Sequence, residues 1–152
     1  MNNVYETKFK ESTVPDIGKW DKIRQELLSM LISDGYPDDM TISFLVAAEE
    51  IFANIAMYAF PEGFCKKDIL SIEYGTGADD PGEYAMITFR DSGAAFDPTK
   101  VSDRKPVDSV RDLKPGGFGI RMVRDKTDRM VYNRKDGMNI LSIIKYKPAK
   151  EV

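Results

Sequence analysis

The sequence contains no histidine and only one cysteine, Cys65, among its 152 residues. Without histidine, the chain cannot supply a Ser-His-Asp triad, a Cys-His nucleophile, an ordinary zinc site or an autophosphorylated histidine. A single cysteine excludes internal disulfides and every CxxC device. These classes of site are therefore excluded within the chain.

Positive charge is not in excess either, because 22 Lys and Arg residues stand against 25 Asp and Glu residues, for a net charge of -3. This balance is typical of a soluble globular protein and provides no basic footprint for nucleic acid. The first residues, MNNVYETKFKES, contain no apolar segment of a signal peptide, and no apolar run approaches the roughly 20 residues of a membrane span. We therefore expect a cytoplasmic protein without direct nucleic-acid or membrane binding.

The chain has the length of one ordinary domain, and such a chain buries about 68–70% of the surface that it exposes when unfolded. Hydrophobic residues make up 42% of it, which is enough for an apolar core. We find no internal repeat, low-complexity tract or shift in composition. The sequence therefore predicts a single domain over residues 1–152.

The spacing of the apolar residues predicts five strands and three helices. Their order places the helices together against a mostly antiparallel sheet. We therefore predict a two-layer α/β (α+β) sandwich, with a mixed, mostly antiparallel sheet and the helices on one face. The predicted strands are 4–10, 68–75, 83–90, 129–134 and 139–146, with a Gly- and Asp-rich turn between the second and the third and a turn at Asp136-Gly137 between the last two. The predicted helices run from Ile17 to Gly35, from Asp38 or Asp39 to a residue before Pro61, and from Phe118 to Lys126. The first of them is predicted from an apolar stripe of Ile17, Trp20, Ile23, Leu27 and Leu31.

The second predicted helix has an unusual far side. Glu50 and Asn54 are one turn apart, opposite the expected core face. Their surroundings there are apolar, which is typical of the wall of a pocket or interface. The alternative is an ordinary Glu and Asn on a partly buried helix. The expected core face is Leu45, Ala48, Phe52, Ile55 and Ala59, and the far side is Val46, Ala47, Ala53, Met57 and Tyr58.

Asp91-Ser92-Gly93 directly follows the third predicted strand. An aspartate at a strand end can accept a hydrogen bond from an exocyclic amine such as that of adenine. A glycine two residues later lets the backbone approach a flat ring closely. The alternative is that D-S-G is simply a turn.

A glycine cluster, Gly116-Gly117-Phe118-Gly119, precedes the last predicted helix. Glycines that open a helix let several backbone N–H groups face one anion, usually a phosphate. The cluster matches neither the Rossmann fingerprint nor a P-loop. A glycine-rich hinge without a ligand is the alternative.

The order and spacing of these three features resemble the Bergerat-fold (GHKL) ATP-binding family, which includes DNA gyrase B, histidine kinases and MutL. Within that family the chain is most similar to the small anti-sigma regulatory factors that are serine/threonine protein kinases. The stretches that carry this resemblance are EEIFANIAMYAF, FRDSGAAFDP and GGFGIRMVRDKTDRMVYNRKDGMNILSIIK.

The resemblance implies ATP and Mg²⁺ as cofactors. It implies that Glu50 is the catalytic carboxylate and that Asn54 ligates Mg²⁺, which typically takes one or two protein oxygens beside phosphate and water. Asp91 would read the adenine amine, and Gly93 would lie against the ring. Ser142 would add a contact to adenine.

The phosphates would be enclosed by Gly117 and Gly119, with residues 98–115 as a lid. The lid cations Arg104, Lys105, Arg111 and Lys114 are candidates for neutralising phosphate charge, and the sequence does not choose among them. The chain departs from the family pattern in two places. Tyr58 stands where many relatives have histidine, and D-S-G-A-A-F lacks the second glycine of the fuller D-x-G-x-G box.

In function, the resemblance implies an anti-sigma regulatory factor that phosphorylates a serine or threonine of an anti-anti-sigma (STAS) partner. A sigma factor as second partner and a homodimer are implied in the same way. Two alternatives stay open. One is a non-catalytic module that holds ATP and a protein partner, and the other is an ATPase that uses water as acceptor.

Overall fold

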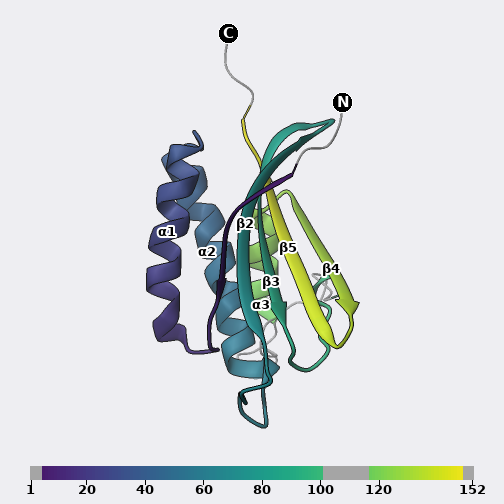
Figure 1. Cartoon of the computed structure of the whole chain (residues 1–152). Coiled ribbons are helices and arrows are strands. Elements are labelled where there is room, and N and C mark those ends of the chain that lie inside the picture. Colours follow the sequence, from purple (N-terminus) through teal and green to yellow (C-terminus); the bar gives the residue numbers. More distant parts are fainter. Residues whose placement is uncertain (1–4, 101–116, 149–152) are drawn as a thin grey trace.

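A computed structural model describes residues 5–100 and 117–148 of the chain. They form one five-stranded sheet in the order β1-β2-β3-β5-β4, and all four neighbouring pairs are antiparallel. The helices lie on one face of this sheet (Figure 1). The predicted two-layer sandwich is therefore confirmed. The strands are β1 (Glu6–Ser12), β2 (Leu70–Asp79), β3 (Gly82–Asp91), β4 (Arg129–Lys135) and β5 (Met138–Tyr146).

The central element of the helical layer is α2 (Asp38–Asn54), which contacts α1 (Trp20–Ser33) and α3 (Gly117–Lys126). It continues without a break into a π turn, η2 (Ile55–Ala59). All three predicted helices are therefore present. Because α2 lies between its two neighbours, its side chains can pack against both of them as well as against the sheet.

Helix α1 confirms most of the apolar stripe seen in the sequence. Trp20, Ile23, Leu27 and Leu31 are each at most 2% exposed. Ile17 is 53% exposed, so its predicted place in the stripe is wrong. The reason is local, since Ile17 lies in a short 3₁₀ turn before α1. Such a turn has three residues per turn rather than 3.6, which shifts its side chains off the stripe.

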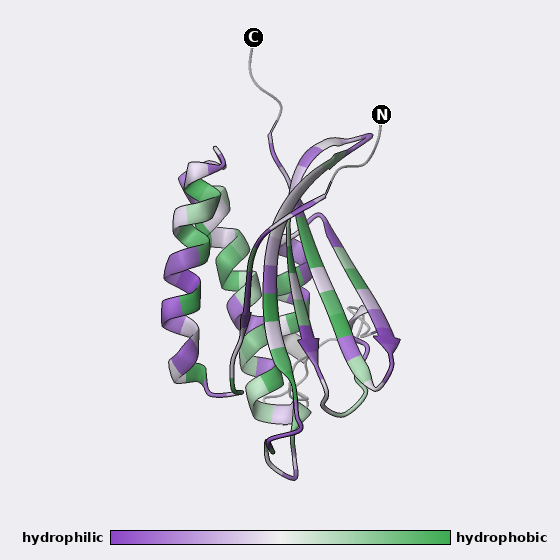
Figure 2. Ribbon diagram, in the orientation of Figure 1, coloured by the Kyte–Doolittle hydropathy of each residue, from purple (hydrophilic) through white to green (hydrophobic). Residues whose placement is uncertain are grey.

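The helical stretch Asp38–Ala59 is 22 residues long and apolar enough, by length and composition alone, to cross a membrane. The sequence analysis expected no such stretch. Its apolar residues are used inside the fold, however: Phe44, Ala48 and Phe52 are at most 1% exposed and belong to the core. Figure 2 shows hydrophobic residues along much of α2, whereas α1 carries a clearly hydrophilic side. The stretch is therefore the core helix of the domain.

Strand β2 extends to Asp79, through the Gly- and Asp-rich segment that the sequence analysis assigned to a turn. Two glycines explain the extension. A Cβ on Gly75 would overlap the Tyr5 ring, and a Cβ on Gly77 would lie 2.6 Å from the Tyr84 hydroxyl oxygen. The tyrosine rings therefore cover the two glycines, which have no side chains of their own. With this cover, β2 continues its backbone hydrogen bonds to the neighbouring strand as far as Asp79.

The face of the sheet opposite the helices carries polar pairs. Glu73 accepts hydrogen bonds from Tyr5 Oη (2.8 Å) and Arg90 Nη1 (2.9 Å), and the hydroxyls of Thr88 and Ser142 are 2.7 Å apart. Because side chains alternate along a strand, Leu141 of β5 points to the opposite, helical face. Ser142 therefore lies on the outer face of the sheet.

The hairpin between β4 and β5 turns at Asp136-Gly137, as predicted. Both residues have positive φ, 54° and 75°, the backbone of a type I′ turn. Gly137 adopts this conformation without strain because it lacks a Cβ. The turn sets the register of β5 against β4, and the pairing of β5 with β3 places Asn139, near the start of β5, opposite Asp91 at the end of β3.

Candidate functional site

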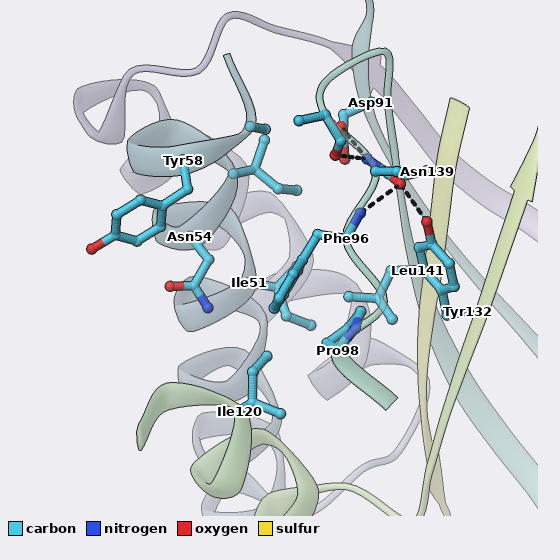
Figure 3. A pocket seen from close by; sticks show the side chains of 14 residues that line it. Ile51, Asn54, Tyr58, Asp91, Phe96, Pro98, Ile120, Tyr132, Asn139 and Leu141 are labelled. Atoms are coloured by element: carbon cyan, nitrogen blue, oxygen red, sulfur yellow. Dashed lines mark hydrogen bonds between the residues drawn. The ribbon is translucent and has the colours of Figure 1, made fainter. Parts of the chain in front are cut away.

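A cavity of about 470 Å³ opens between the end of α2 and the end of the sheet where β3 finishes at Asp91 and β5 begins near Asn139 (Figure 3). Its volume and mostly apolar wall, with a few polar groups, are typical of a small-molecule site. The polar side chains come from α2 with η2, β3, β4 and β5. The lining residues are Ile51, Asn54, Ile55, Tyr58, Ala59, Asp91, Ala94, Ala95, Phe96, Pro98, Ile120, Tyr132, Asn139 and Leu141.

Asp91 is the last residue of β3 and is only 4% exposed. Its Oδ1 accepts hydrogen bonds from the Gly93 backbone N–H (2.9 Å) and from Asn139 Nδ2 (3.0 Å). Burial raises the pKa of Asp91, while these two hydrogen bonds and the charge of Arg134 act in the opposite direction. Within the described residues no hydrogen bond reaches Oδ2, which leaves one oxygen for a ligand.

Asn139 is a polar cavity residue that the sequence analysis missed. Its Nδ2 donates to Asp91 Oδ1 and to the Ala94 carbonyl oxygen (2.8 Å), and its Oδ1 accepts from Tyr132 Oη (2.5 Å) and Arg134 Nη1 (3.0 Å). A signal was present in the sequence. Positions 139, 141 and 143 share one face of β5, and an asparagine in that otherwise apolar series marks a polar site.

Gly93 brings the loop after β3 against the end of η2. A Cβ at this position would overlap the carbonyl oxygen of Ala59, and the next residue, Ala94, donates its N–H to that oxygen at 2.8 Å. Only glycine allows this approach. Gly93 thus faces Ala59 and is not part of the cavity lining, so its position does not favour the expected contact with a flat ring.

Glu50 and Asn54 meet α3 at Gly119. A Cβ on Gly119 would lie 2.5 Å from Glu50 Oε2 and 3.8 Å from Asn54 Nδ2. The glycine therefore allows α3 to pack directly against the carboxylate and amide of α2. Together these three residues form one cluster, as the sequence motifs suggested.

The neighbouring carboxylate points elsewhere. Glu49 is exposed and lines a separate groove between α1 and α2, together with residues such as Leu28 and Ile42. Glu50 lies on the side of α2 that faces α3. The two carboxylates are therefore held in different surroundings, and only Glu50 adjoins Asn54.

The Asn54 side chain lines the cavity, and neither atom of its amide has a hydrogen-bond partner within the described residues. The Nδ2 atom is fully buried. A buried amide without a partner costs free energy, on the order of 1–3 kcal/mol, unless a ligand satisfies it. The amide thus marks the place on the helical wall where a polar ligand group fits.

Ser142 does not join this site. It pairs with Thr88 on the outer face of the sheet, whereas Asn139 and Leu141 of the same strand line the cavity. The register of β5 therefore does not favour the expected adenine contact from Ser142. The residue of β5 that contacts Asp91 is Asn139.

The predicted lid, 98–115, falls mostly outside the described residues, as do its cations Arg104, Lys105, Arg111 and Lys114. Its first residues form a short 3₁₀ turn, Pro98–Lys100, whose Thr99 carbonyl oxygen accepts from Arg124 Nη2 at 2.7 Å. Gly117 is the first residue of α3. The predicted phosphate-binding glycines thus open a helix, as the sequence indicated.

A metal ion at this site would need ligands that the protein does not supply, such as phosphate oxygens and water. Among residues 5–100 and 117–148, no group of three or more Asp, Glu, Cys or His side chains could hold an ion. Mg²⁺ accepts one or two protein oxygens when phosphate and water fill its octahedron. Asn54, which lines the cavity beside the Glu50 carboxylate, would meet that requirement through its amide oxygen Oδ1.

The fold and cavity define a class of protein: a two-layer α/β domain built to hold a small molecule between its central helix and the ends of its central strands. A family model described as "Histidine kinase-like ATPase domain" matches residues 14–145, and the chain belongs to this family of ATP-binding domains. The chain is also 27% identical, over 112 residues, to the serine/threonine-protein kinase BtrW of Bordetella bronchiseptica. That match covers 74% of this chain and 75% of the relative. The family predicted from the three motifs is confirmed.

Proposed function

We propose that this domain binds Mg·ATP and transfers the γ-phosphoryl group to a serine or threonine of a partner protein, as a cytoplasmic anti-sigma regulatory factor. One observation carries the proposal. The cavity has a buried carboxylate, Asp91, on one wall and an unpartnered amide, Asn54, beside Glu50 on the other (Figure 3). Family membership and the similarity to a protein named as a serine/threonine kinase support it.

The adenine end of the cavity would be read by Asp91, whose Oδ2 accepts the hydrogen bond of the exocyclic amine. The apolar walls beside it, such as Ile51 and Leu141, would bury the ring and exclude water. At the other end, the backbone N–H groups at the start of α3, from Gly117 to Gly119, would face the phosphates together with the positive end of the helix.

Asn54 would hold the metal, and bound Mg²⁺ would neutralise charge on the phosphate oxygens. Glu50 would take the proton of the partner hydroxyl as that oxygen forms its bond to the γ-phosphorus. The bond from that phosphorus to the β,γ-bridging oxygen breaks, and ADP leaves with the electron pair. Positioning and charge neutralisation supply most of the rate enhancement in such reactions.

The acceptor hydroxyl would come from another protein. We propose a STAS-domain anti-anti-sigma protein as the acceptor and a sigma factor as a second partner. Two other functions use the same cavity: an ATP-dependent binding module without transfer, and an ATPase with water as acceptor. The phosphoryl acceptor distinguishes these three functions.

The test combines purified protein, labelled Mg·ATP and a STAS-domain protein encoded nearby. We expect label on one serine or threonine of that partner. Glu50→Gln should keep nucleotide binding and lose transfer, and Asn54→Ala should lose transfer because its metal ligand is gone. Glu49→Gln is the matched control, since Glu49 is exposed and lies in the groove between α1 and α2.

Three outcomes contradict the proposal. A partner that binds tightly but is never labelled indicates the binding module. Free phosphate released at the same rate with and without the partner indicates the ATPase. Equal losses of transfer in Glu49→Gln and Glu50→Gln would remove the assignment of Glu50 as proton acceptor.

A further inference from the structure

The Asp91 carboxylate is held by hydrogen bonds on one oxygen only. Gly93 N–H and Asn139 Nδ2 both donate to Oδ1, at 2.9 and 3.0 Å. Because both partners are donors, the atom at this position must be an acceptor. The other oxygen, Oδ2, is left to the cavity.

The orientation of the Asn139 amide is determined by its neighbours. Its Oδ1 faces Arg134 Nη1, and a guanidinium can only donate. Its Nδ2 faces the carbonyl oxygen of Ala94, which can only accept. Exchanging the two amide atoms would set donor against donor and acceptor against acceptor, so Asn139 presents an N–H to Asp91 and no other group.

We propose that Asn139 is a positioning residue that fixes the Asp91 carboxylate with Oδ2 toward the base, and that it thereby makes the cavity select a 6-amino purine over a 6-oxo purine. This inference rests on the proposed ATP function. A fixed, ionised Oδ2 can only accept, so it pairs with the amine of adenine. The 6-oxo group of hypoxanthine is itself an acceptor. It would face Oδ2, another acceptor, and no hydrogen bond could form between the two oxygens.

Burial makes this difference large. Asp91 is 4% exposed, so an acceptor placed against Oδ2 faces a carboxylate that is largely shielded from bulk water. Sites that hydrogen-bond one polar group can reject an analogue that lacks it by up to about 10⁴–10⁵-fold. We expect a preference for ATP over inosine triphosphate of at least about 30-fold, since two buried acceptors would each be left unpaired.

Isothermal titration with ATP and with inosine triphosphate tests the proposal through the ratio of the two dissociation constants. Asn139→Leu removes the donor to Oδ1, and we expect ATP binding to weaken about tenfold while binding of inosine triphosphate changes less than threefold. Asn133→Leu is the matched control. Asn133 is an exposed residue of β4 that pairs with Ile140 of β5, away from Asp91. The ratio of the two dissociation constants should therefore stay the same in Asn133→Leu as in the wild type.

Asp91→Asn gives the sharper readout. The two donors on Oδ1 should keep the new carbonyl oxygen in place and direct the new NH₂ group into the cavity. The preference should then reverse toward inosine triphosphate. In the double variant Asp91→Asn/Asn139→Leu the new amide loses one of the two donors that orient it, and the reversal should shrink by about tenfold.

The outcomes separate this inference from the function on which it rests. A wild-type protein that binds neither nucleotide overturns the ATP function itself. A wild type that binds ATP, with Asn139→Leu weakening both nucleotides by the same factor, overturns only the positioning role. If Asn139→Leu does not fold, Asn139→Ala removes the same donor to Asp91 Oδ1 with a smaller side chain. An unchanged ratio in that variant would also overturn the positioning role.

Discussion

Replacing Gly119 with alanine should displace the Glu50 carboxylate. The added Cβ would lie 2.5 Å from Glu50 Oε2, whereas ordinary van der Waals contact begins at 3.4 Å, so one of the two must move by about 0.9 Å. A displacement of about 1 Å in a catalytic group can cost roughly 100-fold in rate. We therefore expect phosphoryl transfer to fall by about that factor while ATP affinity changes less than threefold.

The same substitution has two opposing effects on stability. Alanine inside a helix is favoured over glycine by about 1 kcal/mol, whereas overpacking costs about 1–3 kcal/mol. Glu50 Oε2 is the far end of a flexible side chain that can shift at little cost, so the overpacking lies at the low end of that range and the free energy of unfolding should change by less than about 1 kcal/mol in the wild-type background. With Glu50→Asp, whose carboxylate is one methylene shorter, the clash disappears and Gly119→Ala should stabilise the protein by about 0.5–1 kcal/mol.

Urea denaturation of the four proteins in this double-mutant cycle measures the coupling directly. We expect an interaction of about 0.5–1 kcal/mol between the two sites. If Gly119→Ala changes stability equally in both backgrounds, the two residues do not contact each other as described. Unchanged transfer in Gly119→Ala would show that the position of Glu50 does not limit the reaction.

Two further predictions concern titration and buried hydrogen bonds. Burial raises the pKa of Asp91, so between its ordinary and its raised pKa the folded protein binds more protons than the unfolded chain, and Asp91 makes stability fall as pH rises through this window. ATP affinity should rise over the same pH window because Oδ2 must be ionised to accept the hydrogen bond of the amine. Urea denaturation and ATP titration, each repeated across this pH range, measure the two trends. If stability and ATP affinity both rise or both fall with pH, the prediction is wrong. Tyr74→Phe should lower the free energy of unfolding by about 1.5–3 kcal/mol, as measured by urea denaturation. The reason is that the hydroxyl of this fully buried ring donates a hydrogen bond to Asp34 Oδ2 at 2.5 Å. A decrease of less than about 0.5 kcal/mol would refute the contribution of that bond.

The elements could be predicted from the sequence because each follows a local rule. The stripe from Trp20 to Leu31 and the turn at Asp136-Gly137 depend only on residue spacing and backbone preference. Glu50 and Asn54 could be paired for the same reason, since one helical turn separates them. The π turn after Asn54 keeps the chain helical up to Ala59, close to the predicted end.

The misses depend on contacts between distant segments. The length of β2 could not be predicted locally, because the residues that cover its glycines are distant in sequence or on another strand: Tyr5 lies before β1, and Tyr84 lies on β3. The choice of Asn139 over Ser142 depends on how β5 pairs with β3, and a shift of one residue turns every side chain to the other face. Sequence spacing gives the alternation along one strand but not its register against a strand about 50 residues away.

The sheet order also determines when this cavity can exist during synthesis. Strand β5 is the last strand in the chain, yet it lies inside the sheet between β3 and β4. Until β5 has been made, β3 presents an unpaired edge, and such edges expose a growing chain to aggregation. The same strand carries Asn139 and Leu141 to the cavity wall. A ribosome-bound chain that lacks β5 therefore has an open sheet and an incomplete binding site, so nucleotide capture can begin only after β5 (Met138–Tyr146) has emerged.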